Sequence, residues 1–235
     1  MTLRDAPESS WDQFTSVEKV VLTRRSTRRY KKMQVPVHLV RRVLEAARFA
    51  PSAGNCQPWR FIVIQNKNML EEMTRLLLAK MKPLEKVVAA HGWKRDVTVA
   101  AVGLLKSQNQ GDLRPFGAVR EVLSGRLKIF HNAPTLILVL KDTRGIDSPE
   151  FDTGICCQNL VLTAHSLGLG TCYIGFAHFL EGNREWMSEM GIEKPWKIAT
   201  AITLGYPFHR SDGLCQRDQP QIDFYDETGP KKTLY

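Results

Sequence analysis

The chain has 235 residues, of which 43% are hydrophobic and 24% are charged, and its formal net charge is +9. These values are close to the averages of globular proteins, so the composition excludes a disordered chain and predicts a sizeable core. The length predicts one large domain, and no apolar run approaches the ~18 residues of a membrane span. The N-terminus carries acidic residues and lacks an apolar core, so we expect no signal peptide and a cytoplasmic protein.

The excess of basic residues favours anionic partners such as phosphates, nucleotides or nucleic acids. No nucleic-acid module or aromatic stacking platform accompanies the positive charge, which argues against nucleic acid. The cysteines number five, without a CxxC pair, and the six histidines are scattered. We therefore expect reduced thiols and no metal site.

The first part of the chain predicts the order helix, helix, strand, helix. Thr15 and Glu18 form a capping-box pattern at the start of the first helix. Pro36 opens the second helix, which carries apolar residues at helical spacing, and Pro51 closes it. The strand and the third helix are predicted at residues 59–65 and 68–81.

The next segment, residues 83–129, has mixed charges and no clean periodicity, so we interpret it as an irregular insertion. After a buried strand at 134–141, Asp152 is placed to cap a long helix that Gly168 ends. Two further strands follow, at 171–175 and 197–205.

This order of elements, without a dividing linker, predicts a single layered domain of the α+β or α/β class over residues 1–235. Residues 207–235 form a polar, proline-containing C-terminal tail.

A cluster of basic residues follows the first predicted helix, with four guanidiniums around a hydroxyl. Its members are Arg24, Arg25, Ser26, Thr27, Arg28 and Arg29. Guanidinium groups bind phosphate through a fixed bidentate fork, so the cluster is a candidate phosphate site. A solvated basic face or a nucleic-acid patch is the alternative.

A loop of small and amide side chains lies between two prolines. Its residues are Pro51, Ser52, Ala53, Gly54, Asn55, Cys56, Gln57 and Pro58. Glycine permits close approach of a ligand, and the two amides offer both donors and acceptors, which suits a flat heterocycle. An ordinary helix-ending turn is the alternative.

Other motifs narrow the chemistry. The glycines of residues 168–175 do not follow the GxGxxG pattern, so the sequence argues against a Rossmann dinucleotide site. Cys156 and Cys157 lie in an apolar helix and are interpreted as core residues. Cys56 is the more exposed candidate, but no acid or histidine partner supports it as a nucleophile.

Taken together, these segments resemble the FMN-dependent nitroreductase family. The resemblance is carried in chain order by RRSTR at 24–28, APSAGNCQPWRF at 50–61, AP at 133–134, residues 152–170, and LGYP at 204–207. It implies a three-layer α/β/α sandwich of the α+β class. It also implies an intertwined homodimer with FMN bound non-covalently between the subunits.

The resemblance assigns roles to particular residues. The phosphate and the pyrimidine edge of FMN are assigned to Arg24, Arg25, Ser26 and Arg28. A loop that reaches the flavin from the partner subunit is assigned to Pro51, Ser52, Ala53, Gly54, Asn55 and Gln57. The backbone beside the flavin N5 atom is assigned to Ile174 and Gly175. In the tail, Arg217 is preferred to Arg210 as a further phosphate ligand.

The implied activity is ping-pong hydride transfer from NADPH or NADH through FMN to an electron-poor acceptor, such as a nitroaromatic or a quinone. The flavin carries the chemistry, so no catalytic side chain is expected. The alternatives are another flavin reaction of the same family, namely reductive dehalogenation or substrate oxidation, and a flavin-binding protein without turnover. The expected partners are a second copy of the chain and a small-molecule substrate, without a nucleic acid or a membrane.

We expect residues 83–129 to cover the flavin and to select the acceptor. In this interpretation Trp93 and Phe116 stack on the substrate. Anionic groups would be attracted by Lys94, Arg95, Arg114 and Arg120. Alternatively, the two aromatic residues anchor the segment to the core or to the other subunit.

Overall fold

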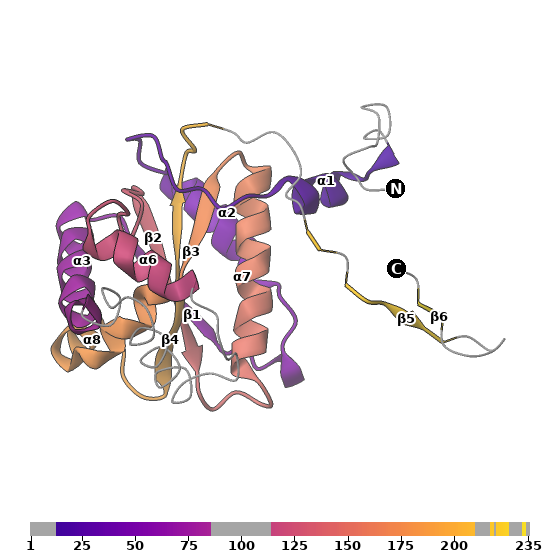
Figure 1. Cartoon of the computed structure of the whole chain (residues 1–235). Coiled ribbons are helices and arrows are strands. Elements are labelled where there is room, and N and C mark those ends of the chain that lie inside the picture. The colour runs from indigo at the N-terminus through magenta and orange to yellow at the C-terminus, as the bar shows by residue number, and fades with distance from the viewer. Residues whose placement is uncertain (1–12, 86–113, 210–216, 219, 226–231, 234–235) are drawn as a thin grey trace, which may run out of the picture. The chain divides into compact units, whose positions relative to one another are not determined.

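The computed structural model describes residues 13–85, 114–209, 217–218, 220–225 and 232–233 (Figure 1). Its elements are α1 (Ser16–Thr23), α2 (Val37–Arg48), η2 (Ala53–Asn55), β1 (Trp59–Ile64), α3 (Lys67–Met81), η3 (Lys82–Leu84), α6 (Arg114–Leu123), β2 (Thr135–Asp142), α7 (Pro149–Ser166), β3 (Gly170–Ile174), η4 (Gly175–Gly182), α8 (Arg184–Glu189), β4 (Trp196–Gly205), β5 (Asp223–Phe224) and β6 (Lys232–Thr233). The chain divides into a larger unit, Arg25–Arg210, and a smaller unit formed by Met1–Arg24 and Ser211–Tyr235.

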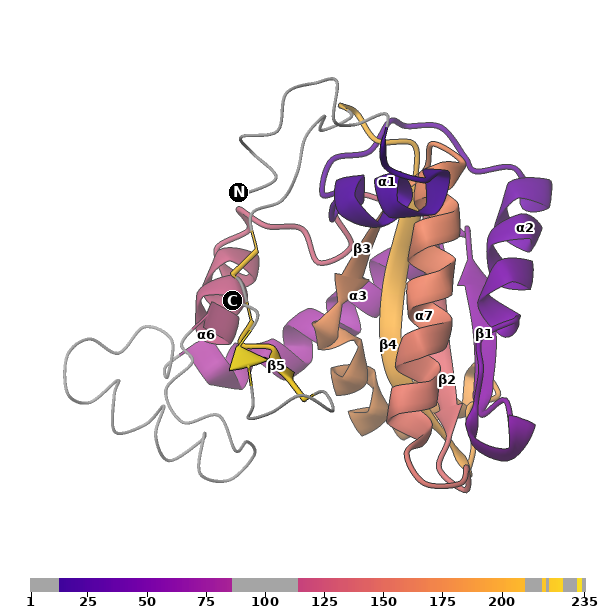
Figure 2. The same ribbon diagram turned by 90° about the vertical axis from the view of Figure 1, so that its right-hand side faces the viewer.

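The larger unit is built on a four-stranded sheet with the order β1-β2-β4-β3. Each neighbouring pair of strands is antiparallel. Helices α2 and α7 cover one face of the sheet, and α3 and α8 lie on the other (Figures 1 and 2). The unit is therefore a three-layer sandwich of the α+β class, as the resemblance predicts.

Two hydrophobic cores fill the spaces between the layers. Alternate side chains of β2 enter opposite cores, since successive residues of a strand face opposite sides of a sheet. Leu136 and Leu138 pack with α3 and η4, whereas Ile137 and Val139 pack with α2 and α7. The central strand is thus buried on both faces, which explains its uninterrupted apolar sequence.

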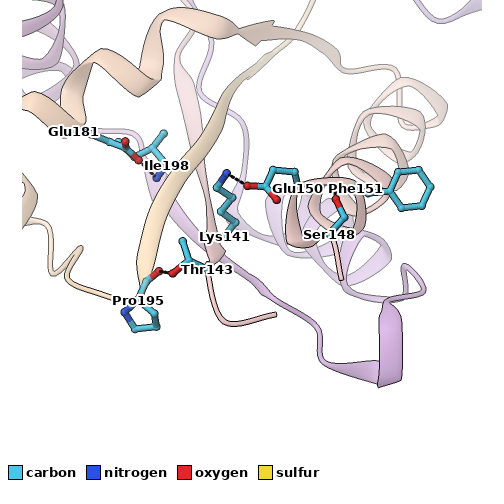
Figure 3. Close-up of polar contacts among 8 residues, drawn as sticks. All are labelled: Lys141, Thr143, Ser148, Glu150, Phe151, Glu181, Pro195 and Ile198. Atoms are coloured by element: carbon cyan, nitrogen blue, oxygen red, sulfur yellow. Dashed lines mark hydrogen bonds and ion pairs between the residues drawn. The ribbon is translucent and has the colours of Figure 1, made fainter. Parts of the chain in front are cut away.

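An irregularity in β4 anchors η4 to the sheet. Val139 and Leu140 pair with Thr200 and Ile198, so the intervening residue of β4 is bulged. The backbone N–H of Ile198 donates to the carboxylate of Glu181 at 2.7 Å (Figure 3). Figure 3 also shows Lys141 reaching Glu150 in the first turn of α7. The first contact attaches η4 to β4, and the second attaches α7 to β2.

Most predicted elements agree with the structure, but η4, α8 and the β5–β6 pair were not predicted, and two further regions differ. Helix α7 begins at Pro149 and is capped by Ser148, whose side chain accepts the N–H of Phe151. The prediction that Asp152 caps this helix is therefore wrong, because Asp152 lies inside it. Part of the segment expected to be irregular forms α6, a helix of 10 residues.

Several residues expected to select the acceptor lie outside the described part of the chain. These are Trp93, Lys94 and Arg95, together with the side chains of Arg114 and Phe116. Arg120 is described and lies exposed on α6.

The smaller unit contains α1 and the β5–β6 pair. The predicted capping box is present: the side chain of Thr15 accepts the N–H of Glu18, and the Glu18 carboxylate accepts the N–H of Thr15. Helix α1 buries none of its residues, and Val17 is 70% exposed. Across the described residues of both units, no helix combines the length and apolar character of a membrane span.

Candidate functional site

The basic segment, Arg25–Tyr30, is bound to the start of β3. Ser26 forms a parallel bridge with Thr171, and the backbone N–H of Thr27 donates to the Thr171 carbonyl at 2.8 Å. A Cβ atom at Gly170 would overlap the side chain of Thr27, so glycine is needed for this close approach. Ser26 and Arg28 remain exposed, while Arg25 is half-buried.

The half-buried phenol of Tyr30 secures the same segment. The hydroxyl of Tyr30 donates to the Thr27 carbonyl at 2.8 Å and lies 2.7 Å from Oγ1 of Thr203 on β4. Burial raises the pKa of Tyr30 well above its usual value, so the phenol keeps its proton. A Cβ atom at Gly205 would lie 2.7 Å from the Tyr30 ring, so this glycine makes room for the tyrosine.

His131 is close enough to Arg28 for the two charges to interact, which the sequence did not predict. Burial, and secondarily the positive charge of Arg28, lower the pKa of His131. The backbone of His131 and Asn132 is left-handed, with φ angles of 53° and 54°. A lone histidine before the Ala133–Pro134 motif gives no sequence signal for this proximity.

The other end of β3 presents open backbone. Ile174 is buried, but Gly175 is exposed, and a Cβ atom at Gly175 would meet no atom of the described residues within 4 Å. The carbonyl of Gly175 is bound by the ring of His178. From Thr171 to Gly175 the strand spans about 13 Å. The basic segment and the open backbone therefore lie at the two ends of one short strand.

The amide loop, Ser52–Gln57, follows α2 and has an unusual backbone. Gly54, Asn55 and Gln57 have positive φ angles of 57°, 55° and 49°. The N–H of Gln57 donates to Ser52 Oγ at 2.9 Å, and its side-chain amide donates to Asn55 Oδ1 at 3.2 Å. All residues from Gly54 to Gln57 are exposed, so their amide groups are available to a ligand.

This loop does not meet the basic segment within one chain. The backbone N–H of Ala53 donates to the carboxylate of Asp152 in the first turn of α7, at 3.2 Å. The basic segment lies at Thr171, beyond the C-terminal end of α7 (Figure 1). The helix between Asp152 and its C-cap, Leu167, is about 22 Å long. Within the larger unit, the basic segment and the amide loop of one chain thus lie at opposite ends of α7.

The other predicted phosphate ligands belong to the smaller unit. Arg24 is the C-cap of α1 and is half-buried, and Arg217 is exposed. Arg210, the alternative to Arg217, lies outside the described residues. The roles of Arg24 and Arg217 remain predictions.

The exposure of three cysteine side chains agrees with the expectations from the sequence. Cys156 and Cys157 are buried in α7, and burial raises the pKa of both thiols to about 12. Cys56 is exposed in the amide loop. Among the described residues, no three His, Cys, Asp or Glu side chains are grouped so that they could hold a metal ion.

Comparison with known proteins gives a consistent result. Residues 21–206 match the model of the nitroreductase family. A 4-nitrobenzoate reductase from Nocardioides is 28% identical over 203 residues, covering 80% of this chain and 79% of the relative.

Two solved structures have a similar fold. A nitroreductase with bound FMN from Desulfitobacterium hafniense has a TM-score of 0.67 and 24% identity, and the match covers 91% of this chain and 100% of that one. An FMN-dependent nitroreductase from Mycobacterium smegmatis, solved with NADPH, has a TM-score of 0.57 and 22% identity, with coverage of 81% and 87%. Because the family model spans most of the chain and the fold agrees, this protein belongs to the nitroreductase family.

Proposed function

We propose that the protein is an FMN-dependent oxidoreductase that takes a hydride from NADPH or NADH and passes it to an electron-poor acceptor. The observation that carries the proposal is the arrangement along β3. Arg25, Ser26 and Arg28 lie at one end and the open backbone of Gly175 lies at the other. The separation of about 13 Å suits an elongated mononucleotide with a phosphate at one end and a planar ring at the other.

The residues present fit FMN. Two guanidiniums and a hydroxyl match a single terminal phosphate, and the sequence has no glycine-rich pyrophosphate loop. The described residues leave open space at Gly175, which would accommodate a flat ring close to the backbone. When bound, FMN supplies the hydride chemistry. The chain itself holds the phosphate and orients the ring, and its backbone beside Ile174 and Gly175 provides polar contacts at the ring edge.

The amide loop is proposed to serve the site of a second copy of the chain. Large apolar side chains surround the loop and are exposed: Phe49 by 71%, Ile146 by 57% and Phe151 by 68%. An exposed apolar patch of this kind is typical of a protein interface. A two-fold dimer would bring the Asn55 and Gln57 amides of one subunit to the basic segment of the other, and would bury the patch.

Subunit complementation tests this shared site. The variant Arg28→Ala removes one half of each site, and Gly54→Trp blocks the other half. Each variant alone should bind FMN poorly. After unfolding and refolding of an equal mixture, about a quarter of the sites should regain FMN, because each mixed dimer contains one intact site. No recovery in dimers of confirmed mixed composition would contradict the shared site.

Absorbance spectroscopy tests the reaction. The purified chain should be yellow. Anaerobic addition of NADPH or NADH should reduce the bound flavin and remove its visible absorbance. A nitroaromatic such as 4-nitrobenzoate should then restore the oxidised spectrum. Bound flavin that neither nucleotide reduces would indicate a binding protein without turnover. FAD in place of FMN would contradict the phosphate argument.

Acceptor choice is assigned to residues 83–129. Helix α6 anchors the end of this segment through Val119 and Val122, which are buried. Replacing Trp93 by Ala should change the Michaelis constants for a nitroaromatic and a quinone while leaving FMN content near normal. We expect the reaction to take place in the cytoplasm, where NADH and NADPH are supplied.

A further inference from the structure

Asp152 stands out among the described residues. It is 6% exposed, and no other Asp, Glu, Lys or Arg side chain in the described ranges is buried. Burial of a carboxylate is unfavourable unless hydrogen bonds or nearby charge compensate. The capping role that the sequence predicts for it is filled by Ser148. The chain therefore retains a costly buried group that α7 does not need for its own N-terminus.

The contacts of Asp152 point to the amide loop. Its Oδ2 atom accepts the backbone N–H of Ala53 at 3.2 Å. Asp152 lies in the first turn of α7, where the helix dipole stabilises a negative charge. The carboxylate therefore joins the start of α7 to the base of the loop that follows α2.

The loop beyond this contact needs such an anchor. Asn55 and Gln57 adopt left-handed backbone, which is unfavourable for a residue other than glycine. Hydrogen bonds within the loop start from its base: Asn55 N–H donates to the Ser52 carbonyl at 2.9 Å, and Cys56 N–H donates to the Ala53 carbonyl at 3.1 Å. Fixing Ala53 to α7 therefore fixes the residues from which the strained turns are built.

We propose that Asp152 is a positioning residue that holds the Ser52–Gln57 loop in the conformation that contacts the flavin. This inference rests on the proposed function for its effect on FMN, but not for its effect on the loop. Without the carboxylate, the loop would populate other conformations. The affinity for FMN would then fall in proportion to the fraction of molecules whose loop keeps the binding-competent conformation. Asp152 acts through the loop and does not itself touch the ligand.

Three variants of the full-length chain separate the hydrogen bond from other effects. Asp152→Ala removes the acceptor, whereas Asp152→Asn keeps an oxygen at the same place. Ala53→Pro removes the N–H donor and leaves the carboxylate. Proline suits this site, because Ala53 opens a 3-10 helix and Ser52 is already extended, with φ −147° and ψ 153°.

The matched control is Glu150→Gln. Glu150 lies in the same first turn of α7, but its carboxylate is paired with Lys141 and not with the loop (Figure 3). The Glu150→Gln variant removes a negative charge from the same turn as Asp152 and leaves the contact between Asp152 and Ala53 unchanged. Any effect that both variants share would come from charge or helix stability.

Hydrogen exchange of the flavin-free protein gives the first measurement. Exchange at residues 54–57 should be about tenfold faster or more in Asp152→Ala and Ala53→Pro than in the wild type. Asp152→Asn and Glu150→Gln should remain close to the wild type. Fluorescence titration with FMN gives the second measurement, where the dissociation constant should rise by about tenfold or more in the same two variants.

The double variant Asp152→Ala/Ala53→Pro completes a cycle, since both changes remove the same bond. Its effect should be much less than the product of the single effects. If Asp152→Ala does not fold, Ala53→Pro alone decides through the same two measurements. Unchanged exchange and unchanged FMN affinity in the folded variants would overturn the proposal. A wild type that binds no FMN would overturn the proposed function, and hydrogen exchange would still decide whether Asp152 holds the loop.

Discussion

The basic segment Arg25–Tyr30 and the amide loop Ser52–Gln57 differ in how the fold holds them. Both follow a helix, and both carry residues assigned to one ligand. The basic segment is bound to β3 through Thr27 and to β4 through the half-buried Tyr30. The loop is exposed from Gly54 to Gln57, and the backbone N–H of Ala53 at its base donates to Asp152. In the proposed dimer, the basic segment would supply one half of the FMN site and the loop would supply the other half to the partner subunit.

Thiol alkylation should give the largest difference between the exposed loop and the helix behind it. Burial raises the pKa of Cys156 and Cys157 to about 12, and only the thiolate reacts. Iodoacetamide should therefore modify Cys56 about a thousandfold faster than either buried thiol in the folded, flavin-free chain. Peptide mass spectrometry measures the three rates. Added FMN should slow only Cys56, and rapid native-state modification of Cys157 would contradict the comparison.

Loss of a guanidinium from the basic segment should have the next largest effect. Arg28→Ala removes charged hydrogen bonds worth about 1.5–3 kcal/mol, so the FMN dissociation constant should rise by about tenfold or more. Titration of flavin fluorescence measures the change. Arg41→Ala is the control, because it removes the same charge from an exposed position on α2. Equal FMN affinity in the two variants would remove Arg28 from the site.

Tyr30→Phe should loosen the segment without changing its charge. The variant loses the bonds to the Thr27 carbonyl and Thr203, so the free energy of unfolding should fall by about 1–2 kcal/mol. Urea unfolding measures this loss. Tyr225→Phe, at a side chain that is 70% exposed, should leave stability near that of the wild type. Hydrogen exchange in the Ser52–Gln57 loop should not respond, because the loop lies at the other end of α7.

The smallest expected effect concerns pH. The pKa of His131 in the folded chain is below that of the unfolded chain, so the unfolded chain binds the proton more readily. Stability should therefore fall as the pH drops from about 6.5 toward the folded pKa, and the fall should be about 1 kcal/mol or less. His131→Gln should show a smaller fall than the wild type in urea unfolding at pH 7 and pH 5. The exposed His38→Gln serves as control, and identical pH profiles for all three proteins would contradict the role of His131.

The sequence predicted the elements whose patterns are strong. The apolar run of β2 and the helical spacing of α2 and α3 follow from burial, and the structure confirms both. Helix α6 was missed because it is short and contains Gly117, which lowers helix propensity. The start of α7 was misplaced because Asp152 is a good capping residue, although Ser148 followed by Pro149 is a stronger signal for a helix start.

The candidate site was predicted in composition but not in geometry. Arginines and amides indicate their chemistry in any sequence, so both groups of residues could be named. That they lie at opposite ends of α7 depends on long-range packing of the helix against the sheet, which no local pattern contains. The proximity of His131 to Arg28 and the bond from Asp152 to Ala53 depend on it in the same way.

The bridge between Ser26 and Thr171 also protects the protein against misassembly. Strand β3 is at the edge of the sheet, and an uncovered edge offers unpaired N–H and carbonyl groups to strands of other molecules. Ser26 and Thr27 occupy the first of these groups with their own backbone. A substitution that detaches the segment would therefore expose a template for aggregation, and selection for solubility would preserve its backbone even in a relative that no longer bound the same ligand.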